Sequence, residues 1–269
     1  MSVSTPEQYL EKFAELFQGG KIATDDPDVS TGFRPWENPK GEFYPASGEA
    51  MRQACQGHLT DRSKPIGVYP LRLDDSSDTY VVHWGCVDWD NGEEESHIHA
   101  SNVREVLRQL GVISWVERSR SKGYHLWVFF REAMLGRRVR EGLIGACNVV
   151  DAPIIEINPK QTELIGKGWG NGVRLPYPAG HAPGRNVIVG PEGELEFEVF
   201  TGLAHSLRIT AELWSSVWQL YREPRRSKPL PSMGSALMLD ELTGLAGAIR
   251  RSGPRVTSSK PHGDRSATL

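Results

Sequence analysis

Strand-like and helix-like segments alternate along most of the chain, and several strands are joined by short polar turns. Residues 79–90 predict a long strand after the turn 74–78, while 113–117 and 124–130 predict two strands joined by the basic turn 118–123. Antiparallel strands can be joined by such short turns, whereas parallel strands need long crossover connections. The pattern therefore predicts a mixed α+β fold rather than an all-parallel sheet.

The other segments divide between helices, short strands and irregular stretches. Residues 21–46 are rich in Gly, Pro and Asp and predict an irregular segment, and 91–96 predict a polar loop. We expect further strands over 66–73 and 154–157 and in pieces over 187–200, and helices from Thr5 to about Gly19, over 47–58, before Gly111, from Leu135 to Leu143, over 211–221 and over 237–249.

Composition and charge leave the partner open. A chain of 269 residues suffices for one large domain or two small ones without disulfide or metal staples. Its three cysteines lie far apart, which argues against a zinc knuckle and favours a reducing cytoplasm. The net charge of −3 argues at first against a nucleic-acid partner, but residues 225–269 carry eight basic against three acidic groups. No run of about eighteen apolar residues occurs, so we expect no membrane span.

Two carboxylates end the long apolar strand. Asp88 and Asp90 are two residues apart, and such side chains point to the same face of a strand. Like charges repel, so a divalent cation is their natural complement. A solvated turn at the strand end is the alternative. Because the apolar run 81–87 brings the pair to the rim of a buried sheet, we interpret it as a candidate active site.

A histidine follows a turn suited to phosphate. His125 comes directly after a segment that contains Ser119, Ser121 and Lys122. Hydroxyls, cations and backbone amides in one turn are the donors that phosphate groups prefer. We therefore interpret this corner as a phosphate-binding site, with a hydrogen-bonded surface histidine as the alternative.

A third acid lies within the apolar strand predicted over 154–157. An unpartnered carboxylate at Glu156 would be costly to bury, and an ion pair with Lys160 or an arginine is one explanation. Downstream, Lys160, Asn171 and Arg174 flank or enter a Gly-rich loop and would suit a phosphate or a template strand. Alone, such loops are usually only loops.

Two other groups are weaker candidates. His97 and His99 follow an acidic loop and could bind a metal, but no third ligand is evident and a solvated helix start is the simpler interpretation. Strand tryptophans could stack on bases, yet they more often lie in the core. Only Trp89 and Trp169, near polar motifs, stay candidates for stacking.

Four segments occur in the order of one known pattern, namely 87–90, 117–130, 156–161 and 170–176. Together with His58 and residues 66–71 upstream, they resemble the archaeo-eukaryotic primase superfamily. The likeness is strongest to the primase-polymerases of phages, mobile elements and TOTE-type conflict systems. It covers roughly residues 45–180, and the ordered set is specific although each piece alone is not.

The resemblance implies a core related to the RNA-recognition-motif sheet, packed against a second small α/β module and followed by C-terminal helices. Asp88 and Asp90 match the first motif, and His125 matches the histidine that contacts the phosphates of the incoming nucleotide. Glu156 stands where the third motif often has Asp. These three carboxylates would then bind two Mg²⁺ or Mn²⁺ ions.

One position departs from the family pattern. The second motif usually has a serine two residues before its histidine, where this chain has Gly123. Ser119 or Ser121 would then supply the hydroxyl. The residues expected to bind the nucleotide phosphates are Ser119, Ser121, Lys122, His125, Lys160 and Arg174, and those expected to contact template are Arg118, Arg120, Trp169 and Asn171.

The implied activity is that of a DNA-dependent primase-polymerase that starts chains on single-stranded DNA from NTPs or dNTPs, with primer extension as a further activity. A non-catalytic replication-initiator module that binds single strands, and a metal-dependent nuclease, are the alternatives. No GxxxxGK[ST] motif occurs, so we expect a separate helicase as partner. The expected location is the cytoplasm of a bacterium or phage-infected host.

These expectations divide the chain into three parts. Residues 1–204 would form the catalytic domain around a motif core at 45–180. Residues 205–250 would form a helical appendage, and the basic, Ser/Gly/Pro-rich residues 251–269 would be disordered.

Overall fold

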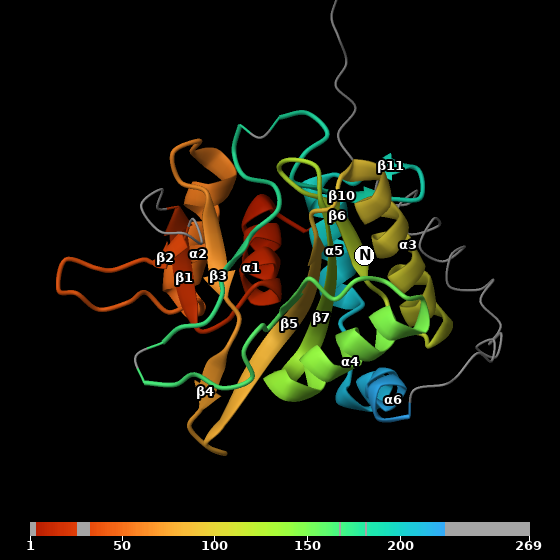
Figure 1. Cartoon of the computed structure of the whole chain (residues 1–269). Helices are drawn as coiled ribbons and strands as arrows, with labels where there is room; N and C mark the ends of the chain where they lie inside the picture. Colours follow the sequence, from red (N-terminus) through yellow and green to blue (C-terminus); the bar gives the residue numbers. More distant parts are fainter. Residues whose placement is uncertain (1–3, 26–32, 167, 181, 224–269) are drawn as a thin grey trace, which may run out of the picture. The chain divides into compact units, whose positions relative to one another are not determined.

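The computed structural model describes residues 4–25, 33–166, 168–180 and 182–223, which form six helices and two antiparallel sheets (Figure 1). The described residues all lie within one compact unit, Ser4–Ser235. The predicted mixed α+β architecture, with a larger core and a second small module, is confirmed. The predicted helix 237–249 and the basic tail lie outside the described residues.

The larger sheet has the strand order β11-β10-β6-β7-β5-β4, and β8 pairs with β5 beside this path. Its strands are β4 (Arg72–Asp74), β5 (Thr79–Trp89), β6 (Trp115–Arg118), β7 (Tyr124–Leu135), β8 (Glu156–Asn158), β10 (Val187–Gly190) and β11 (Gly193–Glu194). The predicted strands 79–90, 113–117 and 124–130 are therefore confirmed, and β6 and β7 form the predicted hairpin.

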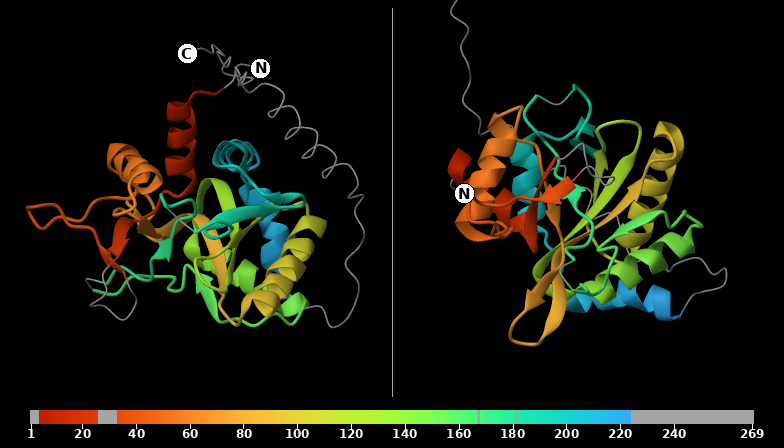
Figure 2. Two further views of the ribbon diagram at one scale, coloured as in Figure 1. Left: turned by 90° about the horizontal axis from the view of Figure 1, so that it is seen from above. Right: turned by 60° about the vertical axis from the view of Figure 1, so that its left-hand side comes forward.

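Helices cover both faces of this sheet (Figures 1 and 2). One face packs against α3 (Glu93–Gln109), α4 (Gly136–Val149) and α6 (Ala211–Arg222), and a Cβ added at Gly85 would meet Val139 on this side. The other face packs against α1 (Pro6–Leu16) and α5 (Phe197–Ser206), where Phe17 contacts Trp127 at a centroid distance of 5.2 Å. Because side chains alternate along β5 and β7, Asp88 and His125 share this second face with Trp127.

The smaller sheet has the order β2-β1-β3-β9, and α2 (Gly48–Thr60) lies beside it. Its strands are β1 (Lys21–Asp25), β2 (Phe33–Pro35), β3 (Ile66–Tyr69) and β9 (Val173–Arg174). The prediction of an irregular segment over 21–46 is therefore wrong for residues 21–25 and 33–35, which form β1 and β2. Ile22 and Ala23 are buried, and β1 pairs with β3 about forty residues away, a partner that local composition does not reveal.

Other boundaries also differ from the prediction; β8, for example, spans Glu156–Asn158 and not 154–157, and α4 runs on to Val149. The strand predicted over 66–73 is interrupted after Tyr69, where Pro70 follows, so that β3 joins the smaller sheet and β4 the larger one. The predicted polar loop 91–96 is already helical from Glu93, whose carboxylate suits the positive end of the helix dipole. The predicted strand pieces end before Phe197, where α5 begins.

The last described helix packs into the core. Trp214 of α6 is 1% exposed, lies against Gly142 of α4 and donates a hydrogen bond from Nε1 to the Arg138 carbonyl. Whether the residues after 204 have a function separate from the catalytic domain stays a prediction. Within the described ranges, no helix is long and apolar enough to cross a bilayer.

Candidate active site

Four polar residues form a row across four neighbouring strands of the larger sheet. Glu117 on β6 lies opposite His125 on β7, His125 lies opposite Asp88 on β5, and Asp88 lies opposite Glu156 on β8. Directly opposed residues in antiparallel strands point to the same face. The strand register therefore gathers residues that are distant in sequence, including three of the four predicted catalytic ones.

His125 lies between two carboxylates. Its Nδ1 is 2.9 Å from Oε2 of Glu117, and its Nε2 is 3.4 Å from Oδ2 of Asp88. Burial alone would lower the pKa of His125, but the charges of Glu117 and Asp88 outweigh burial and hold that pKa well above its usual value. Burial alone would raise the pKa of Asp88. The charge and hydrogen bond of His125 have the larger effect, so that the pKa of Asp88 lies below its usual value. The two carboxylates therefore favour the protonated imidazole, which donates from Nδ1 to Glu117 and faces Asp88 with Nε2.

Glu117 is a site residue that the sequence analysis did not identify. Its side chain is 1% exposed, and Trp127 donates a hydrogen bond from Nε1 to the same Oε2 at 2.7 Å. A buried carboxylate must be paired with a cation, and its ion pair is with His125. The sequence does contain a sign of this role. Glu117 is an acid in an apolar strand, and counting residue pairs outward from the β6–β7 turn places it opposite His125.

Glu156 is positioned by the helix that follows β7. Arg140 of α4 donates hydrogen bonds from one guanidinium nitrogen to the carbonyls of Ile157 and Pro159, at 2.6 and 3.2 Å. These bonds hold β8 against β5. The Glu156 carboxylate lies 3.9 Å from the Lys160 ammonium, the ion pair that the sequence left open as an alternative.

Asp90 and Ser119 meet at Gly123. A Cβ built on Gly123 would lie 2.5 Å from the Trp89 carbonyl oxygen, 2.9 Å from Oδ1 of Asp90 and 3.2 Å from Oγ of Ser119. The chain therefore has no room for the serine that the family usually has here. Ser119 is buried beside this point, whereas Ser121 is exposed.

Restoring the family's residue should therefore damage the protein. We expect Gly123→Ser to lower the free energy of unfolding by about 1–3 kcal/mol, because a side chain there overlaps the Trp89 carbonyl. Urea denaturation measures the change. Gly202→Ala is the matched control, since its Cβ would meet Tyr9 at an ordinary 3.4 Å and alanine suits helix α5. Equal stability of both variants would contradict the crowding at Gly123.

The remaining predicted site residues lie in several places. Arg120, Ser121 and Lys122 are exposed on the β6–β7 turn. Arg118 pairs with Glu93, which also binds Arg185 at 2.8 Å. The other three have partners outside the row. Arg174 is on β9 of the smaller sheet over the Phe33 ring, Trp169 contacts Phe43, and Asn171 accepts a hydrogen bond from Gln161.

Two candidates from the sequence occupy structural positions. Trp89 is fully buried and donates a hydrogen bond from Nε1 to the Pro153 carbonyl, so it is a core residue and not a stacking platform. His99 pairs with Glu95 one helical turn earlier, at 3.3 Å. In the part of the chain that the structure describes, no three His, Cys, Asp or Glu side chains are already gathered around one point as a metal site.

One comparison with known proteins identifies a family. Residues 39–189, more than half of the chain, match the family described as "TOTE conflict system, Archaeo-Eukaryotic Primase domain". Among solved structures, the chain is similar to the polymerase domain of ligase D from Mycobacterium tuberculosis in complex with DNA, with 15% identity and a TM-score of 0.37 over 81% of this chain and 88% of that chain. The search of curated proteins gave no match. On the strength of the family match, the chain belongs to the archaeo-eukaryotic primase domains of TOTE conflict systems.

Proposed function

We propose that the chain is a DNA-dependent primase-polymerase that synthesises primers de novo on single-stranded DNA and extends them by two-metal nucleotidyl transfer. Membership of the archaeo-eukaryotic primase family supports a primase-like nucleotidyl transfer. The observation that supports the finer proposal best is the cross-strand row, in which Asp88 lies between the cationic His125 and the carboxylate Glu156. Such a row can face both a metal ion and a phosphate.

The donor set fits the proposed ions. Asp88, Asp90 and Glu156 offer only carboxylate oxygens, which Mg²⁺ and Mn²⁺ prefer. Asp88 and Glu156 are directly opposed, and Asp90 comes just after the end of β5, with its carboxylate beside Gly123. When bound, the two ions supply positive charge that neutralises the triphosphate and activates a 3′-hydroxyl.

The chain's own cations would bind and orient the triphosphate. Because Glu117 holds one ring nitrogen of His125, the other nitrogen is directed to the Asp88 side, where it can donate to a phosphate oxygen. Lys160 pairs with Glu156 and would leave this ion pair to bind a phosphate group of the nucleotide. Ser119 would donate from the base of the turn, with Lys122 and Arg174 as further phosphate ligands.

The template would follow the exposed basic turn. Arg120 on this turn, with Arg118, Trp169 and Asn171, would contact the backbone or bases of the single strand. A separate helicase would supply that strand. The cations on the turn offset the acidic residues of the row, so that a polyanion can approach the site.

The decisive experiment supplies an unprimed circular single-stranded DNA, labelled NTPs or dNTPs, and Mn²⁺ or Mg²⁺. We expect labelled oligonucleotides that depend on template and on metal, with a chain carrying both Asp88→Ala and Asp90→Ala as the inactive reference. Template and labelled product are followed on the same gel. Adding a primed template separates extension from initiation.

Three results would contradict the proposal. Absence of product with the wild-type chain would favour the alternative, a non-catalytic module that only binds single-stranded DNA. Equal product from the double variant would place the chemistry elsewhere. Loss of template without gain of product would identify a metal-dependent nuclease.

The Glu117 charge should set the protonation of His125. We expect Glu117→Gln to lower the pKa of His125, since one of the two carboxylates that raise it is neutralised while a hydrogen-bond acceptor remains. NMR titration of the imidazole in metal-free protein measures this directly. In the wild type, the stability contributed by His125 is complete below the unfolded-state pKa of about 6.5 and is lost as pH rises through the higher folded-state pKa.

The variant should also bind nucleotide more weakly, with KM raised about 10-fold at neutral pH, as is typical when a supporting partner of a site residue is lost. Glu212→Gln, an exposed acid in the first turn of α6, is the control and should change neither quantity. An unchanged imidazole titration in Glu117→Gln would show that Glu117 does not govern His125.

A further inference from the structure

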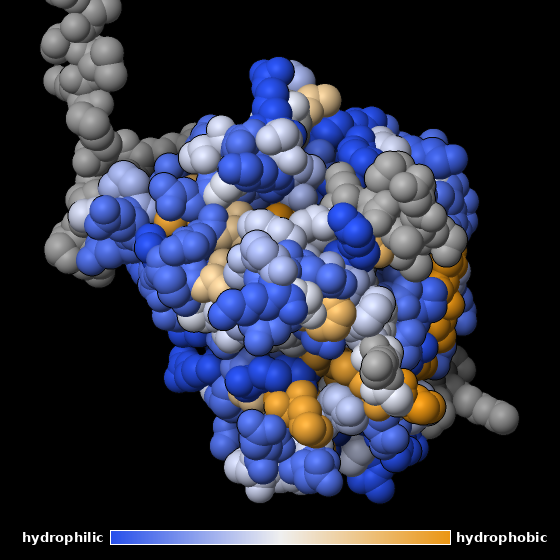
Figure 3. Space-filling view, turned by 90° about the vertical axis from the view of Figure 1, so that its left-hand side faces the viewer, coloured by the Kyte–Doolittle hydropathy of each residue, from blue (hydrophilic) through white to orange (hydrophobic). Residues whose placement is uncertain are grey.

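A pocket whose lining includes none of the residues of the polar row lies between α2 and the smaller sheet. It has a volume of about 590 Å³, within the usual range for small-ligand sites. Its walls come from β1, α2, the segment that follows β2 and the loop before β3, none of which contributes Asp88, His125 or Glu156. The face of the molecule that carries β1, β2 and α2 is largely hydrophilic, with apolar residues gathered in small patches (Figure 3).

Two aromatic rings form one wall of this pocket. Trp36 and Tyr44 have centroids 4.9 Å apart with their planes at 50°, and Trp36 is 38% exposed although it is large and apolar. Their backbones are fixed, because Trp36 donates to the Ile22 carbonyl and Tyr44 donates to the Trp36 carbonyl, each at 2.9 Å. A rigid, partly exposed indole presents a ready surface for a flat ring.

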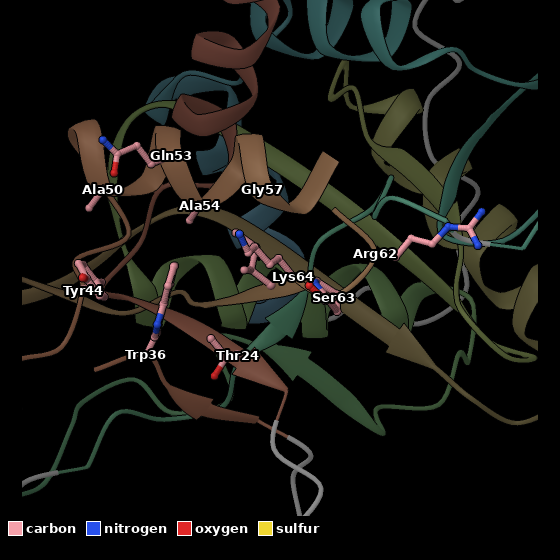
Figure 4. Close-up of a pocket in the computed structure, with 12 residues that line it drawn as sticks. Thr24, Trp36, Tyr44, Ala50, Gln53, Ala54, Gly57, Arg62, Ser63 and Lys64 are labelled. Atoms are coloured by element: carbon pink, nitrogen blue, oxygen red, sulfur yellow. The ribbon is translucent and has the colours of Figure 1, made fainter. Parts of the chain in front are cut away.

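Two cationic residues, Arg62 and Lys64, line this pocket. The stem of Lys64 runs along α2, where a Cβ on Gly57 would lie 3.3 Å from its Cδ, and the ammonium is 3.3 Å from Asp61 on the surface. Figure 4 shows Lys64 between α2 and the aromatic pair, whereas Arg62 extends away from them. Among the described residues that line the pocket, none is acidic. The Lys64–Asp61 pair is exposed and therefore weak, so Lys64 can leave it to bind an anion in the pocket.

Polar groups complete the lining. Gln53 of α2, Thr24 of β1 and Ser63 offer an amide and two hydroxyls around the aromatic wall. An aromatic wall, a lysine and a few neutral hydrogen-bonding groups match the three parts of a nucleotide, which are a flat base, an anionic phosphate and polar base edges.

We propose that this pocket binds one nucleotide unit, with the base against Trp36 and the phosphate at Lys64. The bound nucleotide would be either one residue of a single strand or a free nucleotide, since both carry a base and a phosphate. The proposal goes beyond nucleotidyl transfer, because it needs neither the carboxylate row nor a metal.

The test measures binding in EDTA, without catalysis. A fluorescein-labelled oligodeoxythymidine is titrated with the full chain and followed by anisotropy. We expect Trp36→Ala to weaken binding about 10-fold, and Trp36→Phe to stay within about twofold of wild type because a ring remains. Lys64→Gln should reduce the slope of log affinity against log salt by about 0.7, the change for one phosphate contact on a single strand. The matched controls are Tyr221→Ala, which removes an exposed aromatic on α6, and Lys40→Gln, which removes an exposed lysine outside the pocket lining.

A second arm uses the wild-type chain, so that it does not depend on the folding of a variant. An oligonucleotide containing 5-iododeoxyuridine is cross-linked by light, and the modified peptide is identified by mass spectrometry. Adducts on Trp36 or Tyr44 are expected. Competition by free dTTP against the labelled strand would identify the free nucleotide as a ligand, and its absence would identify the strand.

Two results would overturn the proposal. One is affinity within about twofold of wild type for both Trp36→Ala and Lys64→Gln. The other is cross-linking that maps only to residues outside the pocket. Failure of primer synthesis would leave these measurements unaffected, so the two proposals can fail separately.

Discussion

Replacing Asp88 alone by alanine should lower nucleotidyl transfer by about 10³-fold or more. Asp88 is the central carboxylate of the row, where it faces both His125 and Glu156. Its loss removes a proposed metal ligand, and metal charge supplies several kcal/mol to a transition state of this kind. Each 1.36 kcal/mol corresponds to tenfold in rate. Steady-state incorporation of labelled nucleotide on a primed template, with Mn²⁺ in excess, measures the change.

Two variants complete that experiment. Asp88→Asn keeps the shape and the hydrogen-bonding oxygen but removes the charge, so we expect it to be nearly as inactive as Asp88→Ala. Asp75→Ala removes an exposed carboxylate from the β4–β5 turn of the same sheet and should retain full activity. Activity of Asp88→Ala within tenfold of wild type would remove Asp88 from the catalytic residues.

Trp214→Ala should lower the free energy of unfolding by about 3–5 kcal/mol, the usual cost of truncating a buried tryptophan. The indole is 1% exposed, contacts the Phe130 ring at 5.1 Å and lies on Gly142 of α4. Its removal would leave a cavity between α6, α4 and the larger sheet. Chemical denaturation, followed by circular dichroism at several wavelengths, measures the change and shows whether unfolding remains a single transition.

Trp218→Ala on the same helix is the control. This ring is only partly buried, and its Nε1 donates to Glu141 at 2.7 Å, so we expect a loss of about 1 kcal/mol. A loss below that value for Trp214→Ala would mean that α6 is a separable appendage and not part of the core.

The sequence predicted local elements well and long-range partners poorly. The strand 79–90 was recognisable because an apolar run follows a polar turn and ends in acids, and observed β5 spans Thr79–Trp89. The strands β1 and β2 are five and three residues long and lie in a Gly- and Pro-rich stretch. Their stability comes from pairing with each other and with β3, which no local pattern shows.

The same reasoning applies to the site. Asp88 and His125 stood out as polar residues at the ends of apolar strands, and Glu156 as an acid within one. Glu117 escaped notice because its importance depends on register, since it becomes a partner of His125 only when β6 and β7 pair. Arg140 likewise lies on an apparently exposed basic helix face, yet it holds β8 through two carbonyls. Sequence patterns predicted which groups could react, and the pairing of strands determined which groups support them.

The aromatic contact beneath the row sets a practical limit on how the protein can be shortened. Trp127, which binds Glu117, packs against Phe17 at the end of α1, and Phe17 packs against Phe13 at 4.8 Å. A chain cut to the family-matched residues 39–189 would retain Asp88, His125 and Glu156 but lose these two phenylalanines. Any fragment prepared for crystallisation should therefore begin ahead of Thr5, because the matched stretch of sequence is shorter than the piece of protein that folds.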